Sequence, residues 1–417
     1  MSLTSVPCKI LEHIITSAIA HHLETNNILC PEQHGFRKSR SCETQLLDLT
    51  GELFETVENG QQADIVVLDF AKAFDKVSHS LLTHKLSSYG VRGKVNAWIQ
   101  SFLEDRKQAV LVNGEKSDMV AVRSGVPQGS VIGPLLFLAY INDLPQQLKS
   151  PARLFADDTL VYRLSASEED QNALQDDLLQ LEKWEKCWDM EFHPAKCVVL
   201  HATKKRATKA KLYSLHGQTL KSVSSAKYLG VTLASDLCWD NHITNICSKA
   251  NRTLGFLRRN LKVGSTKLKA TAYKTLVRPI LEYASTVWDP HTQTNVGRLE
   301  AVQRRAARYT LNRYKQTESV SAMLDNLQWP TLTHRRKVAR LSMLKKMTRN
   351  EAIVSKKLLI PTTRQQRGHE QQFQTIHCRT LYRQQSFLPR TIKDWNSLPP
   401  DTIAADSLDA FKARVPL

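Results

Sequence analysis

Two adjacent aspartates, Asp157 and Asp158, interrupt an otherwise apolar stretch that includes residues 152–156 and 159–162. Two ionised carboxylates about 4 Å apart repel each other by roughly 1 kcal/mol in water and by about 4 kcal/mol at the effective dielectric of a protein surface. A bound divalent cation would offset this repulsion. Because the flanking residues favour β-structure, the pattern predicts a hairpin whose tight turn presents both acids. A plain polar turn with solvated aspartates is the alternative, since aspartate is common in turns.

A third acid, Asp69, ends the run Asp64–Phe70, which predicts a buried strand, and a helical pattern follows from Ala71 to Tyr89. The end of such a strand is where an α/β sheet presents its chemistry. Asp157 lies 88 residues after Asp69, so only a fold that brings two strands together can unite them. Magnesium prefers carboxylate oxygens and substrate phosphates, so three such acids favour a two-metal phosphoryl-transfer site.

Four segments carry a family resemblance: LDFAKAFDKVSH from Leu68, SGVPQGSVIGPLLF from Ser124, FADDTLVY from Phe155 and AKYLGV from Ala226. In this order and spacing they resemble the reverse transcriptase of a non-LTR (LINE-type) retrotransposon, and the resemblance extends over nearly the whole chain. It implies an α+β right-hand polymerase with fingers, an RRM-like palm and a helical thumb, followed by a C-terminal basic extension.

Periodicity and the resemblance together predict the domain boundaries. Amphipathic helices are expected at about 240–260, 266–287 and 296–311, as in a thumb that packs on one face and touches phosphates on the other. The expected domains are fingers at 1–63 and 90–125, palm with primer grip at 64–89 and 126–235, helical thumb at 236–350, and an extension of unassigned role at 351–417.

The resemblance assigns catalysis to Asp69, Asp157 and Asp158, with the main-chain carbonyl of Phe70 as a further metal ligand. Lys196 takes the position of a lysine that could protonate the departing pyrophosphate. An ordinary surface lysine is the alternative for Lys196.

Phe74 matches an aromatic residue that, in reverse transcriptases, lies under the sugar of the incoming nucleotide and obstructs a 2′-hydroxyl. An apolar helix residue facing the core is the alternative. Gln128 and Gly129 match the backbone region that lines the nucleotide and template pocket, where glycine allows close approach. A helix N-terminal turn capped by Ser130 is compatible with that role.

The segment QHGFRKSRS from Gln33 resembles the fingers motif whose basic residues hold the triphosphate, here Arg37, Lys38 and Arg40. Guanidinium groups suit phosphate oxygens because they bind them bidentately. A solvated basic loop is the alternative. The segment Tyr228-Leu229-Gly230 matches the hairpin that grips the primer strand near its 3′ end.

The basic residues are unevenly distributed along the chain. Residues 1–200 contain 19 basic and 27 acidic side chains, whereas residues 201–417 contain 39 and 13. The second part is therefore predicted to attract a polyanion in a salt-dependent manner. Two of its densest clusters are Arg304-Arg305 with Arg308, and His334–Lys337 with Arg340.

Several classes of protein are not expected. The sequence has no run of about eighteen uncharged apolar residues and no signal-peptide pattern, so we expect no membrane span and an intracellular protein of the nucleus or cytoplasm. The eight cysteines form no Cys-x-x-Cys pair, which favours reduced thiols over structural zinc.

The sequence thus predicts an RNA-directed DNA polymerase that extends a primer 3′-hydroxyl with deoxynucleoside triphosphates and two Mg²⁺ ions, with Mn²⁺ as a substitute. RNA template and DNA primer are the expected partners, and RNA as template rests on the resemblance. The alternatives are a catalytically decayed nucleic-acid-binding protein and an RNA-dependent RNA polymerase, which Phe74 disfavours. No endonuclease domain is recognisable, so a fragment or truncated copy is expected.

Overall fold

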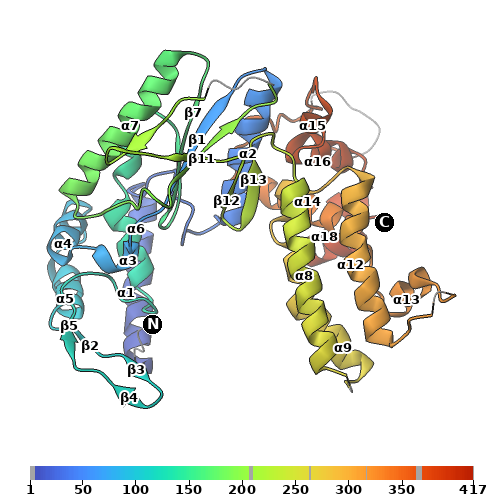
Figure 1. Cartoon of the computed structure of the whole chain (residues 1–417), viewed down its shortest axis with the longest axis horizontal. Helices are drawn as coiled ribbons and strands as arrows, with labels where there is room; N and C mark the ends of the chain where they lie inside the picture. Colours follow the sequence, from blue (N-terminus) through green and yellow to red (C-terminus); the bar gives the residue numbers. More distant parts are fainter. Residues whose placement is uncertain (1–4, 206–209, 263, 316, 363–368, 417) are drawn as a thin grey trace. The chain divides into compact units, whose positions relative to one another are not determined.

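The computed structural model describes residues 5–205, 210–262, 264–315, 317–362 and 369–416. The chain forms two compact units, which Figure 1 traces by colour along the sequence. The first unit consists of Met1–Ser41 and Gln61–Leu229, and the second of Cys42–Gly60 and Gly230–Leu417.

A five-stranded sheet forms the centre of the first unit, in the order β11-β8-β1-β7-β6. Strand β1 pairs antiparallel with β7 and with β8, while β11 joins β8 in parallel. Nearly all of β1 is buried, as expected for a central strand covered on both faces. The strands are β1 (Ala63–Leu68), β6 (Ala152–Phe155), β7 (Asp158–Leu164), β8 (Val198–Ala202) and β11 (Lys221–Ser222).

The helices of the first unit pack their apolar residues into one core with this sheet. Helix α6 is almost wholly buried, and helix α7 begins with a capping box made by Ser167 and Asp170. The helices are α1 (Val6–Thr25), α3 (Ala73–Lys76), α4 (His79–Ser88), α5 (Gly93–Leu103), α6 (Gly133–Ile141), the 3₁₀ helix η1 (Leu144–Gln147) and α7 (Glu168–Cys187).

Short strands complete the first unit. An exposed ribbon is formed by β2 (Lys107–Gln108) with β5 (Val120–Ala121) and by β3 (Leu111–Val112) with β4 (Glu115–Lys116). Strands β9 (Ser214–Leu215) and β10 (Gln218–Thr219) pair with each other, and β12 (Ser225–Tyr228) ends the unit.

A buried carboxylate, Asp64, anchors the middle of the sheet. It accepts hydrogen bonds from Gln62 Nε2 and Tyr213 Oη, each at 2.7 Å, and pairs with His201 Nδ1 at 2.7 Å. Burial alone would raise the pKa of Asp64, but the bonds from His201, Tyr213 and Gln62 outweigh it and lower that pKa. The network therefore fixes strand β1, which leads directly to Asp69.

The predicted hairpin and the strand before Asp69 are confirmed. The continuous helix predicted from Ala71 to Tyr89 is wrong, because the chain breaks between α3 and α4. At the break the carbonyls of Phe74 and Val77 accept hydrogen bonds from the amides of Val126 and Gly125, at 2.8 and 2.7 Å. A contact with a distant loop thus replaces the intrahelical bonds.

The second unit is mainly helical. Helices α8 and α12 confirm the helices predicted at about 240–260 and 296–311. The helix predicted at 266–287 is wrong at its end, because it stops at Glu282, before Ala284 in the left-handed region. The elements are α2 (Cys42–Glu58), β13 (Val231–Ala234), α8 (Asp240–Asn260), α9 (Thr266–Ala272), the π-helix η2 (Tyr273–Val277), α10 (Arg278–Glu282), α11 (Ser285–Trp288), α12 (Gln293–Leu311), α13 (Val320–Asn326), α14 (Leu332–Thr348), α15 (Leu381–Gln384), α16 (Phe387–Asn396), α17 (Pro400–Ile403) and α18 (Leu408–Arg414).

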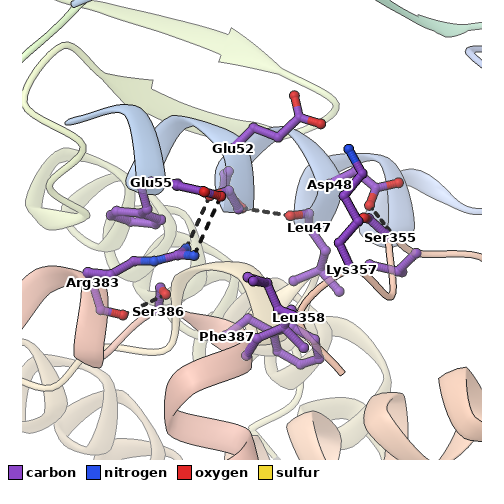
Figure 2. Close-up of a pocket in the computed structure, with 15 residues that line it drawn as sticks. Leu47, Asp48, Glu52, Glu55, Ser355, Lys357, Leu358, Arg383, Ser386 and Phe387 are labelled. Atoms are coloured by element: carbon purple, nitrogen blue, oxygen red, sulfur yellow. Dashed lines mark hydrogen bonds and ion pairs between the residues drawn. The ribbon is translucent and has the colours of Figure 1, made fainter. Parts of the chain in front are cut away.

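The described residues beyond 350 pack against α2 and α14 rather than forming a separate tail. A cavity of about 260 Å³ lies between α2 and the residues 354–358 and 383–388. Figure 2 shows the Arg383 side chain among the residues that line it. The buried Arg383 guanidinium donates to the Gly51 carbonyl at 3.1 Å and lies 3.9 Å from carboxylate oxygens of Glu55 and Glu58. Arg383 thereby ties α15 to α2.

Part of the predicted polyanion-binding surface is buried instead. Within the cluster at residues 334–340, Arg336 and Arg340 are 1% and 2% exposed, and both donate to the carboxylate of Asp289, at 2.7 and 2.9 Å. Arg390 of α16 lies 3.3 Å from the same carboxylate. The three arginines hold the unit together, and the buried Arg336 and Arg340 are not available to a ligand in solvent.

Within the described residues, no helix has the length and apolar character that a membrane crossing requires.

Candidate active site at the edge of the central sheet

The turn that carries Asp157 is held in place by hydrogen bonds to the QHGF segment. Ala156 has a φ of 53°, in the left-handed region, and its amide donates to Gln33 Oε1 at 2.9 Å. The same oxygen accepts from the amide of Gly35 at 2.8 Å. A Cβ on Gly35 would lie only 2.5 Å from the Ala156 nitrogen, so glycine is required there. Sequence reasoning missed this role of Gln33 and Gly35, because the contact joins segments far apart in the chain.

Asp69 reaches the same place from the neighbouring strand. Leu68 is paired with Thr159, so the next residues in register are Asp69 and Asp158. Neighbouring antiparallel strands place such residues about 5 Å apart between Cα atoms. The Asp69 carbonyl accepts from the His193 amide at 2.8 Å, and the Phe70 ring stacks on Phe192 at 4.1 Å. The strand end is thereby fixed by the segment that precedes β8.

The three acids influence one another electrostatically. Burial and the charge of Asp69 raise the pKa of Asp157. Burial, Asp157 and Asp69 raise the pKa of Asp158, which the Lys227 ammonium partly lowers. Nearby protein atoms thus desolvate these carboxylates in part, but both residues remain exposed at the surface, so water weakens their repulsion. The structure therefore brings Asp69, Asp157 and Asp158 into one electronegative site.

Two lysines accompany these acids. Lys196 Nζ lies 3.3 Å from Asp69 Oδ1, and both side chains are about half exposed, at 58% and 48%. Lys227, on β12, is exposed and close enough to Asp158 to affect its pKa. The sequence indicated Lys196 but gave no signal for Lys227 beyond its place in the AKYLGV segment.

The donor set suits a hard cation completed by a substrate. No group of three or more His, Cys, Asp or Glu side chains among the described residues forms a ready-made metal cage. Mg²⁺ is usually held by one or two carboxylates together with water and substrate phosphates, so it does not require such a cage. Exposed carboxylates that repel one another satisfy this chemistry.

Phe74, in helix α3, lies next to the GVPQG loop, whose Val126 amide donates to the Phe74 carbonyl. The Phe74 ring stacks on Phe137 with centroids 4.4 Å apart and is half-buried, so it both faces the core and retains an exposed part. Gln128 Nε2 is 3.5 Å from Asp75 Oδ1, and Gly129, with a φ of 101°, is exposed. The N-cap of α6 is Ile132 and not Ser130 as expected, although Ser130 Oγ accepts a hydrogen bond from the Gly133 amide at 3.0 Å.

The three basic residues of the QHGFRKSRS segment differ in their surroundings. Arg37 donates from Nε and Nη2 to Glu24, at 2.8 and 2.6 Å, and from Nη1 to the Cys30 carbonyl at 2.6 Å. The Arg37 guanidinium is thus already bonded within the protein, to Glu24 of α1 and to the backbone of its own loop. Arg40 Nη1 donates to the Gln33 carbonyl at 3.2 Å, while Lys38 is exposed.

The YLG segment forms a tight turn after β12. Tyr228 is buried at 2% exposure, Leu229 has a φ of 44°, and Gly230 has a φ of 82°. The backbone of the turn, rather than the Tyr228 ring, is therefore the part presented to solvent.

The stretch of chain that holds these residues also resembles known proteins. Residues 1–233 match the family model described as reverse transcriptase (RNA-dependent DNA polymerase). The chain is 30% identical over 327 residues to the probable RNA-directed DNA polymerase from transposon BS of Drosophila melanogaster, covering 74% of this chain and 35% of that protein. It is 29% identical over 316 residues to the RNA-directed DNA polymerase from mobile element jockey of Drosophila funebris, covering 72% and 34%. The chain thus spans about a third of the length of these relatives.

Among solved structures, apo telomerase from Candida tropicalis aligns with a TM-score of 0.44 at 11% identity, over 78% of this chain and 54% of that one.

Proposed function

The chain belongs to the reverse transcriptase (RNA-dependent DNA polymerase) family, and we propose that it is an RNA-directed DNA polymerase of a non-LTR retrotransposon. In this proposal it extends a primer 3′-hydroxyl on an RNA template with deoxynucleotides. The observation that carries the proposal is the meeting of Asp69 with Asp157 and Asp158 at one sheet edge, where desolvation first and then the neighbouring acids raise the pKa of both paired acids.

Asp69, Asp157, Asp158 and the carbonyl of Phe70 would hold the metal in this site. Two Mg²⁺ ions, when bound, would stabilise the attacking and leaving oxygens of an in-line displacement. The carboxylates position the reacting groups and carry the negative charge that makes the site a cation site. Lys196, 3.3 Å from Asp69, is the proposed proton donor to the departing pyrophosphate.

The remaining site residues bind the nucleotide and the primer. Lys38 and Arg40 are the proposed phosphate contacts, and Arg37 takes part once its bonds to Glu24 rearrange. Gln128 and Gly129 line the nucleotide pocket, and the exposed part of Phe74 selects the sugar. The Tyr228–Gly230 turn grips the primer.

In domain terms, the five-stranded sheet is the proposed RRM-like palm, at residues 64–89 and 126–235. Residues 1–63 with 90–125 are the proposed fingers, and residues 236–350 the thumb. Helices α8 and α12 carry basic side chains that would contact backbone phosphates; Arg298 and Arg305 link these helices through Thr244 and Asn251.

Incorporation of labelled dTTP on primed poly-rA tests the proposal. The purified chain is expected to incorporate label when Mg²⁺ is present and to stop when the metal is chelated. A chain that binds the primed template but incorporates no label at any Mg²⁺ or Mn²⁺ concentration would contradict it.

Replacing Phe74 with valine is expected to lower the preference for dTTP over UTP by about 10- to 100-fold, because the obstruction to a 2′-hydroxyl is removed. The stack with Phe137 is also lost, at a cost of about 1 kcal/mol. The measurement is kcat/KM for each nucleotide on the same primed template. Phe102→Val is the matched control, since Phe102 is likewise half-buried and stacked, on Trp98 at 5.3 Å. Unchanged selectivity in Phe74→Val would remove Phe74 from the sugar-binding site.

A further inference from the structure

One aromatic side chain is displayed from an otherwise buried segment of the second unit. Tyr283 is 47% exposed, whereas residues 284–290 are all buried. It follows the helix that contains the π-turn η2, and Ala284 after it has a φ of 50°. π-turns within helices are frequent near functional sites. The chain thus directs a large ring to solvent directly before seven buried residues.

The ring of Tyr283 lies against Gly230. A Cβ built on Gly230 would be 2.9 Å from Tyr283 Cε1 and 3.5 Å from Cζ. With its φ of 82°, Gly230 is therefore restricted to glycine both by backbone conformation and by the ring. Tyr283 forms one wall beside the turn that the proposed function assigns to the primer.

A chain of buried contacts holds Tyr283 in this position. Trp288, which is fully buried, donates from Nε1 to the Tyr283 carbonyl at 2.9 Å. The ring of His242 meets the Trp288 ring at 5.1 Å, and His242 Nδ1 accepts from the Thr232 amide of β13 at 3.2 Å. Burial lowers the pKa of His242 to about 4, so Nδ1 remains an acceptor at neutral pH. The backbone of Tyr283 is thus tied through Trp288 and His242 to the strand that follows Gly230.

Two arginines gather around Glu282, the residue before Tyr283, and give this place an excess of positive charge. Glu282 accepts a hydrogen bond from Arg335 Nη2 at 3.0 Å and lies 3.6 Å from Arg278 Nε. Two guanidinium groups share one carboxylate, which leaves a net charge of about +1 in this group. The Arg335 and Arg278 side chains are 33% and 21% exposed, so they are accessible to an anion.

An exposed aromatic ring beside excess positive charge is the combination that binds nucleic-acid strands, by base stacking and phosphate attraction. We propose that Tyr283, with Arg278 and Arg335, forms a contact for the nucleic-acid strand held at the Gly230 turn, with the ring against a base or sugar. This inference rests on the proposed function for the identity of that strand. It assigns Tyr283 a positioning role, since the ring would hold the strand and take no part in the reaction.

Binding of a primer–template with 2-aminopurine at the primer 3′ end, measured in EDTA, tests the contact without catalysis. Tyr283→Ala is expected to weaken binding about tenfold and to abolish the stacking-dependent quenching of 2-aminopurine. Tyr283→Phe should stay within twofold of the wild type. Tyr283→Leu keeps an apolar side chain against Gly230 and should still lose the quenching, which separates stacking from folding.

Leu381→Ala is the control, because Leu381 is an apolar side chain of the same unit that is 60% exposed and lies in neither α8 nor α12. Wild-type affinity and quenching in Tyr283→Ala, equal weakening in Leu381→Ala, or no binding by the wild type would each overturn the inference. If the wild type incorporates no nucleotide yet shows Tyr283-dependent binding, the polymerase proposal fails and the inference is supported. If it incorporates nucleotide and Tyr283→Ala binds normally, the inference fails alone.

Discussion

Replacing Asp157 and Asp158 together with asparagine is expected to lower dTTP incorporation on primed poly-rA by at least about 10³-fold. The loss of about 4 kcal/mol of transition-state stabilisation that this represents is typical for removal of metal-mediated charge stabilisation. The substitution is nearly isosteric, so the β6–β7 hairpin should persist. The measurement is kcat at saturating nucleotide and metal.

The same variant, although it loses activity, should be at least as stable to unfolding as the wild type when no metal is present. The pKa of each carboxyl is raised in the folded chain, by burial first and then by neighbouring acids. Stability that comes from such groups is present at low pH and is lost as the pH rises through their folded-state pKa values. At neutral pH the ionised pair therefore opposes folding, and the metal-free variant should melt no lower than the wild type.

Mg²⁺ should raise the Tm of the wild type and leave that of the variant unchanged, since only the wild type gains a bound ion. The control is Glu115→Gln with Asp118→Asn, which removes two exposed acids of the β-ribbon and should preserve both the activity and the response to Mg²⁺. Full activity in the Asp157→Asn, Asp158→Asn variant would exclude these acids from catalysis.

The second large effect is expected at Asp289, in the second unit. Its carboxylate is 4% exposed and faces Arg336, Arg340 and Arg390. Asp289→Asn would leave buried guanidinium groups without their counter-charge, at a cost of about 3–5 kcal/mol. Arg340 keeps a second partner in Asp394, at 2.8 Å. This one carboxylate cannot balance the positive charge of all three arginines.

Hydrogen exchange along α14 and α16 measures this effect, because both helices contribute arginines to Asp289. The variant should exchange much faster there than the wild type. Asp409→Asn is the matched control: Asp409 pairs with Lys412, but its side chain is 92% exposed, so little change is expected. Unchanged protection of α14 in Asp289→Asn would show that the buried charges do not hold the unit together.

The features that the sequence predicted correctly depend on local patterns. The hairpin at Asp157, the strand before Asp69 and helix α8 follow from alternation, turn residues and helical periodicity within short windows. The functional link between Asp69 and Asp157 rests on the metal chemistry that the three acids share and on the family resemblance, because no local pattern contains it.

The features that the sequence missed depend on contacts between distant segments. The break between α3 and α4 exists because the loop at Gly125 and Val126 bonds to that turn. The sequence likewise could not distinguish a basic side chain that faces solvent from one that is buried with an acid, as Arg336 is with Asp289. Arg37, bound to Glu24, is a further case.

Electron paramagnetic resonance of bound Mn²⁺ tests the central claim directly, with a primer–template and an unreactive nucleotide analogue present. If Asp69, Asp157 and Asp158 form a two-ion site, the wild type should bind two Mn²⁺ whose spins are coupled at about 4 Å, and the Asp157→Asn, Asp158→Asn variant should lose the coupled pair. An identical spectrum from both chains, or ions that remain uncoupled in the wild type, would contradict the two-metal account.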